Sequence, residues 1–136
     1  MKKNLEVKDI KASGAVRVGV FKGVNLTVDK NKSIREAGFY FIGTNNGSVV
    51  YATHAGNQYR QRGFEETLIR IRSPRTNQVR EVVDYLNSGL VVNLYYMKYN
   101  QVRNLMGIEE YRAQNNGHEL IGKIRSKYTI HGRLCS

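Results

Sequence analysis

The chain has 136 residues, enough for one compact domain with a modest hydrophobic core. No stretch approaches the roughly 18 apolar residues of a membrane-spanning helix, and no apolar run follows the basic N-terminus as in a secretory signal. The 22 Lys and Arg residues outweigh 11 Asp and Glu, so the formal net charge is +11 and the pI is about 10.0. This balance favours a polyanionic partner, most simply nucleic acid; no basic amphipathic helix with a strongly apolar opposite face points to a membrane.

The cysteine and histidine content argues against disulfides and zinc. The single cysteine, Cys135, lies next to the C-terminus and cannot form an internal disulfide, which fits a reducing cytosol. His54, His118 and His131 are too scattered for a zinc site with one cysteine. The chain also has no P-loop or Rossmann glycine pattern.

The first part of the chain predicts a β-hairpin. Residues 1–11 are polar, and we expect them to be loosely held. Between residues 12 and 30, valine and leucine alternate with other residues on both sides of Lys22-Gly23. This period of two predicts an N-terminal hairpin with one buried face, followed by a polar connection to Ala37.

A second hairpin is predicted around Asn46-Gly47, the strongest short-range hairpin signal in the chain. A type I′ turn there needs a positive φ at both central residues, which Asn and Gly tolerate. In that register Tyr40 lies opposite Thr53 and Tyr51 lies opposite Ile42, so the two tyrosines share one face as diagonal neighbours. The pattern alone favours half-buried strand aromatics; the alternative is a phenol-bearing surface that handles phosphate.

The second half of the chain is predicted to be mostly helical. A helix over residues 57–72 is expected to stop at Pro74. The next helix has Thr76 as its N-cap, apolar residues at i, i+3, i+4 and i+7, and Gly89 as its C-terminal glycine. Residues 90–97 are rich in β-branched and aromatic side chains and predict a strand.

The C-terminal part is predicted to contain further short helices. One or two are expected between Tyr99 and Asn116, and the last runs from His118 to Lys127 with Leu120, Ile121 and Ile124 facing inward. The predicted fold class is therefore α+β, a small antiparallel sheet flanked by helices in a single domain of residues 1–136.

The two tyrosine segments resemble the motifs of the GIY-YIG nuclease superfamily. Gly38-Phe39-Tyr40 matches the first motif and Tyr51-Ala52-Thr53 the second, at the family's spacing, and Arg62 matches the arginine that follows them. The helix and strand between Asn77 and Met97 are similar to those of phage endonuclease II-type members. The resemblance covers residues 36–132 as a nuclease core and treats the hairpin of residues 12–30 as an N-terminal extension.

This resemblance implies a Mg²⁺-dependent DNA endonuclease of restriction or phage type that hydrolyses phosphodiester bonds in a bacterial or phage-infected cell. Glu119, with Glu110 as the alternative, would bind Mg²⁺ or another divalent cation such as Mn²⁺. Arg62 would pair with the scissile phosphate, Tyr40 would act as general base and Tyr51 would orient the water. Cutting both strands of double-stranded DNA would require a homo-oligomer or sequential nicking.

The residues also allow a non-catalytic basic nucleic-acid-binding protein and, with less support, a structural protein of a ribonucleoprotein. Arg62 is then a solvated or phosphate-positioning residue, and Glu119 is a first-turn glutamate favoured by the helix dipole. In the nuclease and the binding protein alike, we expect contacts to the nucleic-acid backbone, which give affinity and salt dependence. The expected contact residues are His54, Arg60, Arg70, Arg72, Arg75, Lys123 and Arg125, with Arg80 and Lys127 beside them.

Overall fold

The computed structural model describes residues 3–55, 63–75, 77–90, 92–106 and 117–130. In chain order the elements are β1 (Lys3–Asn4), α1 (Val7–Ala12), β2 (Val16–Lys22), β3 (Asn25–Val28), β4 (Gly38–Thr44), β5 (Val49–Ala55), α2 (Glu65–Arg72), α3 (Asn77–Leu86), β6 (Val92–Met97), α4 (Tyr99–Met106), α5 (Gly117–Lys127) and β7 (Tyr128–Thr129). The α+β class predicted from the sequence is confirmed.

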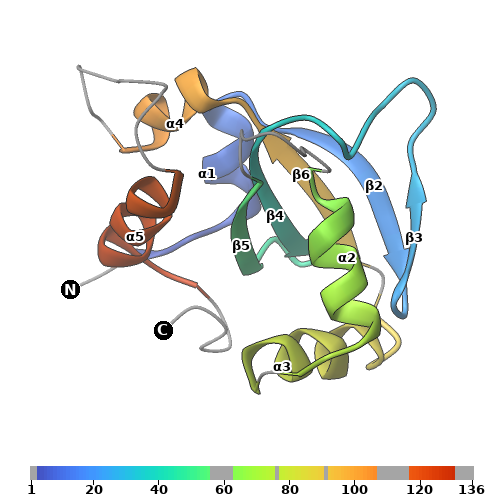
Figure 1. The fold of residues 1–136 in the computed structure, drawn as a ribbon. Coiled ribbons are helices and arrows are strands. Elements are labelled where there is room, and N and C mark those ends of the chain that lie inside the picture. The colour runs from blue at the N-terminus through green and yellow to red at the C-terminus, as the bar shows by residue number, and fades with distance from the viewer. Residues whose placement is uncertain (1–2, 56–62, 76, 91, 107–116, 131–136) are drawn as a thin grey trace.

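A five-stranded antiparallel sheet with the order β3-β2-β6-β4-β5 forms the centre of the molecule (Figure 1). β6 lies between β2 and β4, where Tyr96 pairs with Tyr40 and Tyr95 pairs with Phe41. The N-terminal hairpin, β2 and β3, is thus an integral part of this sheet. The predicted N-terminal hairpin is therefore present, and β2 connects it to the rest of the sheet by pairing with β6. β1 and β7 pair in parallel as a second, two-stranded sheet.

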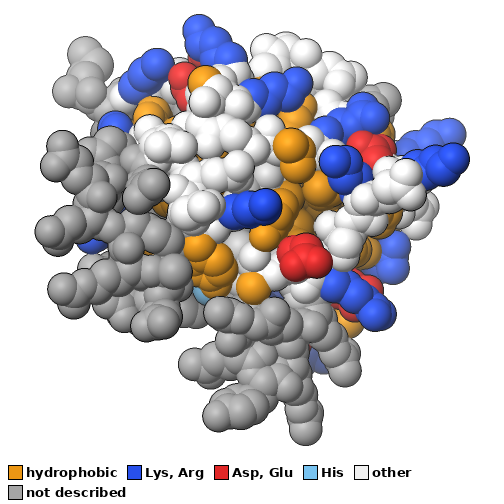
Figure 2. Space-filling model, turned by 90° about the horizontal axis from the view of Figure 1, so that it is seen from above, with side chains coloured by type: hydrophobic (Ala, Val, Ile, Leu, Met, Phe, Trp, Pro, Cys, Tyr) orange, Lys and Arg blue, Asp and Glu red, His pale blue; other side chains and the backbone are white. Residues whose placement is uncertain are grey.

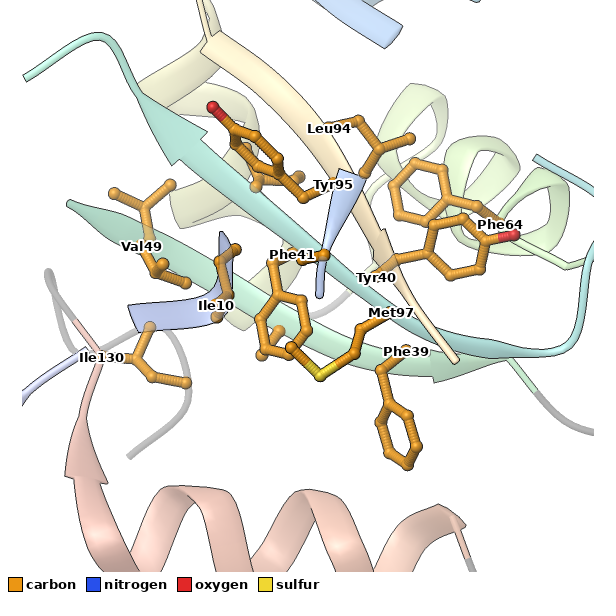
Figure 3. Packing of buried hydrophobic residues seen from close by; sticks show 14 of the residues in the cluster. Ile10, Phe39, Tyr40, Phe41, Val49, Phe64, Leu94, Tyr95, Met97 and Ile130 are labelled. Atoms are coloured by element: carbon orange, nitrogen blue, oxygen red, sulfur yellow. The ribbon is translucent and has the colours of Figure 1, made fainter. Parts of the chain in front are cut away.

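Helices cover both faces of the sheet. α1, α4 and α5 lie on one face, and α2 and α3 lie on the other (Figure 1). Tyr40 and Phe64 pack toward α2, whereas Phe39, Phe41 and Met97 point to the opposite side, toward α5 (Figure 3). All seven residues of β4 are buried, so this strand is the centre of the core.

The N-terminal residues are held firmly, so the expectation of a loose segment over the first eleven residues is wrong. Leu5 and Ile10 are buried in the core. The backbone N–H of Leu5 donates to the carbonyl of Thr129 (2.9 Å), and the Leu5 carbonyl accepts from the N–H of Val49 (3.2 Å). The buried apolar side chains anchor the segment although most of its residues are polar.

The register predicted for the tyrosine hairpin is confirmed. Tyr40 pairs with Thr53, and Ile42 pairs with Tyr51. A register shift between Ile42 and Gly43 places one extra residue in β5, so the correct pairing is reached through a β-bulge.

The turn of this hairpin differs from the type I′ prediction. Gly47 has φ 96°, whereas Asn46 is not among the described residues with positive φ. The N–H of Gly47 donates to the carbonyl of Thr44 (3.1 Å), which closes a three-residue loop with glycine in the left-handed position. The side chain of Asn46 instead contacts the Thr44 hydroxyl.

The helices follow the sequence patterns with one exception. The helix predicted for residues 57–72 begins only at Glu65, because buried Gly63 adopts φ 54° and breaks the backbone path before α2. α2 ends before Pro74, α3 is followed by Gly89 at φ 88°, and the predicted inner face of α5 is buried. Thr76 and residues 107–116 lie outside the described part of the chain.

Candidate nucleic-acid interface

Tyr40, predicted as a general base, is a core residue. Its side chain is completely buried, with ring centroids 5.3 Å from Phe64 and 5.1 Å from Tyr96. Its hydroxyl donates a hydrogen bond to the carbonyl of Glu36 (2.7 Å). Burial raises the pKa of Tyr40 far above its usual range, so the phenol stays neutral and cannot receive a proton from water.

One feature of the sequence indicates this burial. The run Phe39 to Ile42 is apolar at every position, which is typical of a strand covered on both faces. A strand with one solvent-exposed face would alternate apolar and polar residues. The continuous run therefore predicts a buried Tyr40 more strongly than the two-tyrosine pattern predicts a catalytic one.

Tyr51 and His54 lie on opposite faces of β5 because side chains alternate along a strand. Tyr51 is half-buried on the same face as Tyr40. His54 is half-buried on the other face, where its Nε2 contacts the Tyr99 hydroxyl and its ring lies 5.2 Å from that of Phe39. The structure therefore places His54 in an aromatic cluster beside α4 and does not bring it together with the two predicted catalytic tyrosines.

The other predicted catalytic residues fall outside the described atoms. Arg60, Arg62 and Glu110 lie in segments that are not described, and the side chain of Glu119 in the first turn of α5 is not described either. In the part of the chain that is described, no group of three or more His, Cys, Asp or Glu residues is placed to hold a metal ion. The magnesium role of Glu119 thus stays a prediction, resting on the resemblance alone.

On the face shown in Figure 2, the Lys and Arg side chains are spread out rather than gathered in one patch. Three groups of basic residues are separate in the fold. The α5 surface consists of Lys123, Arg125 and Lys127, the sheet-edge surface of Lys22, Lys30 and Lys32, and the junction group of Arg70, Arg72 and Arg75. All of these side chains are exposed except that of Arg125, which is half-buried.

The α5 surface has a simple helical geometry. Leu120, Ile121 and Ile124 face the sheet and are buried, so Gly122 and Ser126 lie on the opposite, outward side at 100° per residue. A Cβ added to Gly122 would meet no atom within 4 Å, so the outward ridge is low and open. On this geometry Lys123 lies on one flank of the ridge and Arg125 on the other, whereas Lys127 lies closer to the buried face, beside Leu120.

The position of α5 is fixed by contacts to the preceding helix. Lys127 Nζ and the Tyr128 hydroxyl both donate to the carbonyl of Leu105 near the end of α4, each at 3.2 Å. The ammonium of Lys127 also lies 5.4 Å from the centre of the Tyr128 ring, within cation–π range. The α5 surface is therefore presented on a packed helix rather than on a loose segment.

The charge balance differs between the two helical layers. From the start of α4 to the end of α5, five basic residues outweigh three acidic residues, so the net charge is +2. From α2 to the end of α3, four arginines are matched by four acidic residues, so the net charge is zero. The predicted contacts of the junction group thus belong to an electrically balanced layer, and α5 carries the stronger positive field.

The family comparison covers almost the whole chain. Residues 2–134 match the model of the T4-like phage nuclear disruption protein (Ndd) family. No curated protein and no solved structure matches the chain. This is a different family from the GIY-YIG nucleases, so the resemblance was wrong. Two tyrosines on adjacent strands also occur where aromatic residues simply fill a core, as Tyr40 does here.

Of the described helices, none is long and apolar enough to span a membrane.

Proposed function

Because the chain belongs to the T4-like phage nuclear disruption protein family, we propose that it binds the double-stranded DNA of the host's nuclear material in the cytoplasm of the infected cell, without cleaving it. The observation that carries this proposal is the outward side of α5, where cations flank a low ridge on a helix of net positive charge. The chain's overall net charge of +11 supports the same partner.

The α5 surface suits the phosphate backbone rather than base edges. Lysine ammonium groups on long flexible side chains act as point charges toward phosphates, and arginine adds a planar fork. A ridge formed by Gly122 and Ser126 lets the helix approach the backbone closely, since no large side chain stands in front of it. Such contacts give binding that depends steeply on salt and little on sequence.

The burial of Tyr40 supports binding without hydrolysis. A water-activating base must reach its proton at hydrogen-bond distance, and the Tyr40 hydroxyl is instead bonded to a backbone carbonyl inside the core. Its raised pKa further disfavours proton transfer at neutral pH. The binding proposal needs none of the predicted catalytic roles.

The test combines binding and cleavage. Fluorescence anisotropy with a labelled DNA duplex is expected to show binding in EDTA, without any requirement for Mg²⁺, and weaker binding as NaCl is added. Supercoiled plasmid is expected to stay intact in Mg²⁺. Glu119→Ala is expected to bind at least as well as the wild-type protein, since it removes a negative charge. Mg²⁺-dependent nicking that disappears in Glu119→Ala would refute the non-catalytic proposal. Tighter binding to an RNA duplex of equal length would refute the choice of DNA.

A further inference from the structure

We infer that the sheet-edge surface is a second DNA-binding surface, so that one molecule holds two duplex segments at once and bridges them. This inference rests on the proposed function, because it assigns a second contact to the same partner. It concerns Lys22 at the end of β2, and Lys30 and Lys32 in the connection after β3.

The three lysines of the sheet-edge surface are exposed, and none forms an ion pair with a described residue. The nearest acidic residue in sequence, Asp29, is already bound by Arg17, with Nε 2.8 Å from Oδ2. Its negative charge is therefore offset locally, and the lysines retain a net positive field.

Local backbone geometry supports the position of Lys30 and Lys32. The N–H of Lys32 donates to the carbonyl of Asp29 (3.0 Å), which closes a turn with Asn31 in the left-handed region at φ 64°. The turn thus presents two lysines at one end of the edge, and Lys22 lies at the other end. Between them, Asn25 and Thr27 of the edge strand are exposed and polar.

The α5 and sheet-edge surfaces lie on opposite sides of the molecule (Figure 1). β3 is one edge of the five-stranded sheet and β5, against which α5 packs, is the other. Four strand spacings of about 4.8 Å separate the edges by about 19 Å, before α5 itself is added. Because the two surfaces lie at opposite edges of the sheet, the phosphates that one surface contacts are not those that the other contacts.

The helical layer between these surfaces does not join them into one continuous basic track. The segment from α2 to the end of α3 has four arginines and four acidic residues, which cancel. A duplex that follows one surface therefore meets no net positive path to the other across α2 and α3. Two separate duplex segments can bind the two surfaces, one at each, without DNA wrapping around the protein.

The experiment measures capture of a second duplex. A biotinylated duplex on beads is incubated with the protein, and retention of a second, fluorescent duplex is measured. The wild-type protein is expected to retain it. In Lys22→Gln/Lys30→Gln/Lys32→Gln, retention is expected to fall on the order of a hundredfold, because up to three phosphate contacts are lost. Affinity for a single duplex, bound by α5, is expected to change by only about twofold, the statistical factor for losing one of two sites.

The matched control removes the same charge elsewhere. Arg70→Gln/Arg72→Gln/Arg75→Gln is expected to keep most of the bridging, and sedimentation of the unbound protein is expected to report a monomer. Binding of one duplex without retention of a second would overturn bridging and leave the proposed function intact. Equal loss of bridging in both triple variants would also overturn the bridging proposal. So would a sheet-edge variant that bridges two duplexes normally but aggregates, because the edge lysines would then serve to prevent strand pairing between molecules. Absence of any DNA binding would refute the proposed function itself.

Discussion

Replacing the two lysines of α5 should weaken DNA binding and flatten its dependence on salt. The variant is Lys123→Gln/Lys127→Gln, in which each side chain keeps much of its length and its polarity. Glutamine at position 127 can still donate an N–H to the carbonyl of Leu105, the acceptor that Lys127 Nζ uses at 3.2 Å. The change therefore removes charge from the α5 surface with little effect on how α5 is held.

The size of the effect follows from counterion release. Each phosphate contact contributes about 0.9 to the slope of log affinity against log salt, so two lysines contribute about 1.8. Relative to the affinity at 1 M salt, one phosphate contact raises the affinity at about 0.1 M salt by a factor of about 8, and two contacts raise it about 60-fold. The background is Lys22→Gln/Lys30→Gln/Lys32→Gln, so that binding at the sheet-edge surface does not mask the loss.

The assay is fluorescence anisotropy with one labelled duplex over a series of NaCl concentrations. Arg70→Gln/Arg72→Gln in the same background is the control, because it removes an equal charge from the electrically balanced layer and should change the slope less. Far-ultraviolet circular dichroism checks that both variants are folded. An unchanged slope in the lysine variant, or equal changes in both variants, would refute the assignment of DNA contacts to α5.

Three further outcomes test the core and the outward side of α5. Tyr40→Phe should lower the free energy of unfolding by about 1 kcal/mol in urea denaturation, through loss of its hydrogen bond to Glu36, and leave DNA affinity unchanged. The free energy of unfolding should fall as the pH rises above about 10. Burial raises the pKa of several tyrosines in the folded state, so the unfolded chain loses these protons at a lower pH than the folded protein does. A free energy of unfolding that stays constant in urea titrations from about pH 8 to 11 would contradict this. The tyrosines concerned are Tyr40, Tyr95, Tyr96 and Tyr99. In the Lys22→Gln/Lys30→Gln/Lys32→Gln background, Gly122→Glu should bind a duplex more weakly than Gly122→Gln, since both side chains enter open space and only one adds negative charge. Equal affinities would place the DNA away from the outward side of α5.

Local periodicity was sufficient to predict most of the elements. Alternating residues predicted the β2–β3 hairpin, and the apolar stripes predicted α3 and α5. These patterns work because burial of one face is a local property of a strand or helix. The order of strands is not local: β6 inserts between β2 and β4 through pairings such as Tyr40 with Tyr96, which no spacing in the sequence specifies.

The family resemblance was wrong because a short motif was given more weight than burial. Tyr40 and Tyr51 do share a face, as predicted, but that face is covered by α2, with Phe64 against the Tyr40 ring. A motif of a few residues records only sequence and spacing, and it carries no information on what covers a strand. The charge excess is a property of the whole chain and does not depend on such a motif, so the proposal of a polyanionic partner rests on it.

Two modest surfaces on one molecule are together more effective than either alone. Once the α5 surface holds one duplex, any neighbouring segment is at a high effective concentration for the sheet-edge surface, so the second contact forms without a further bimolecular step. In densely packed DNA, contacts that are weak and reversible at physiological salt would then still connect segments that are distant along the chromosome. On the proposed function, each bound molecule would hold two DNA segments together, so binding without cleavage would be enough to change the arrangement of the host DNA.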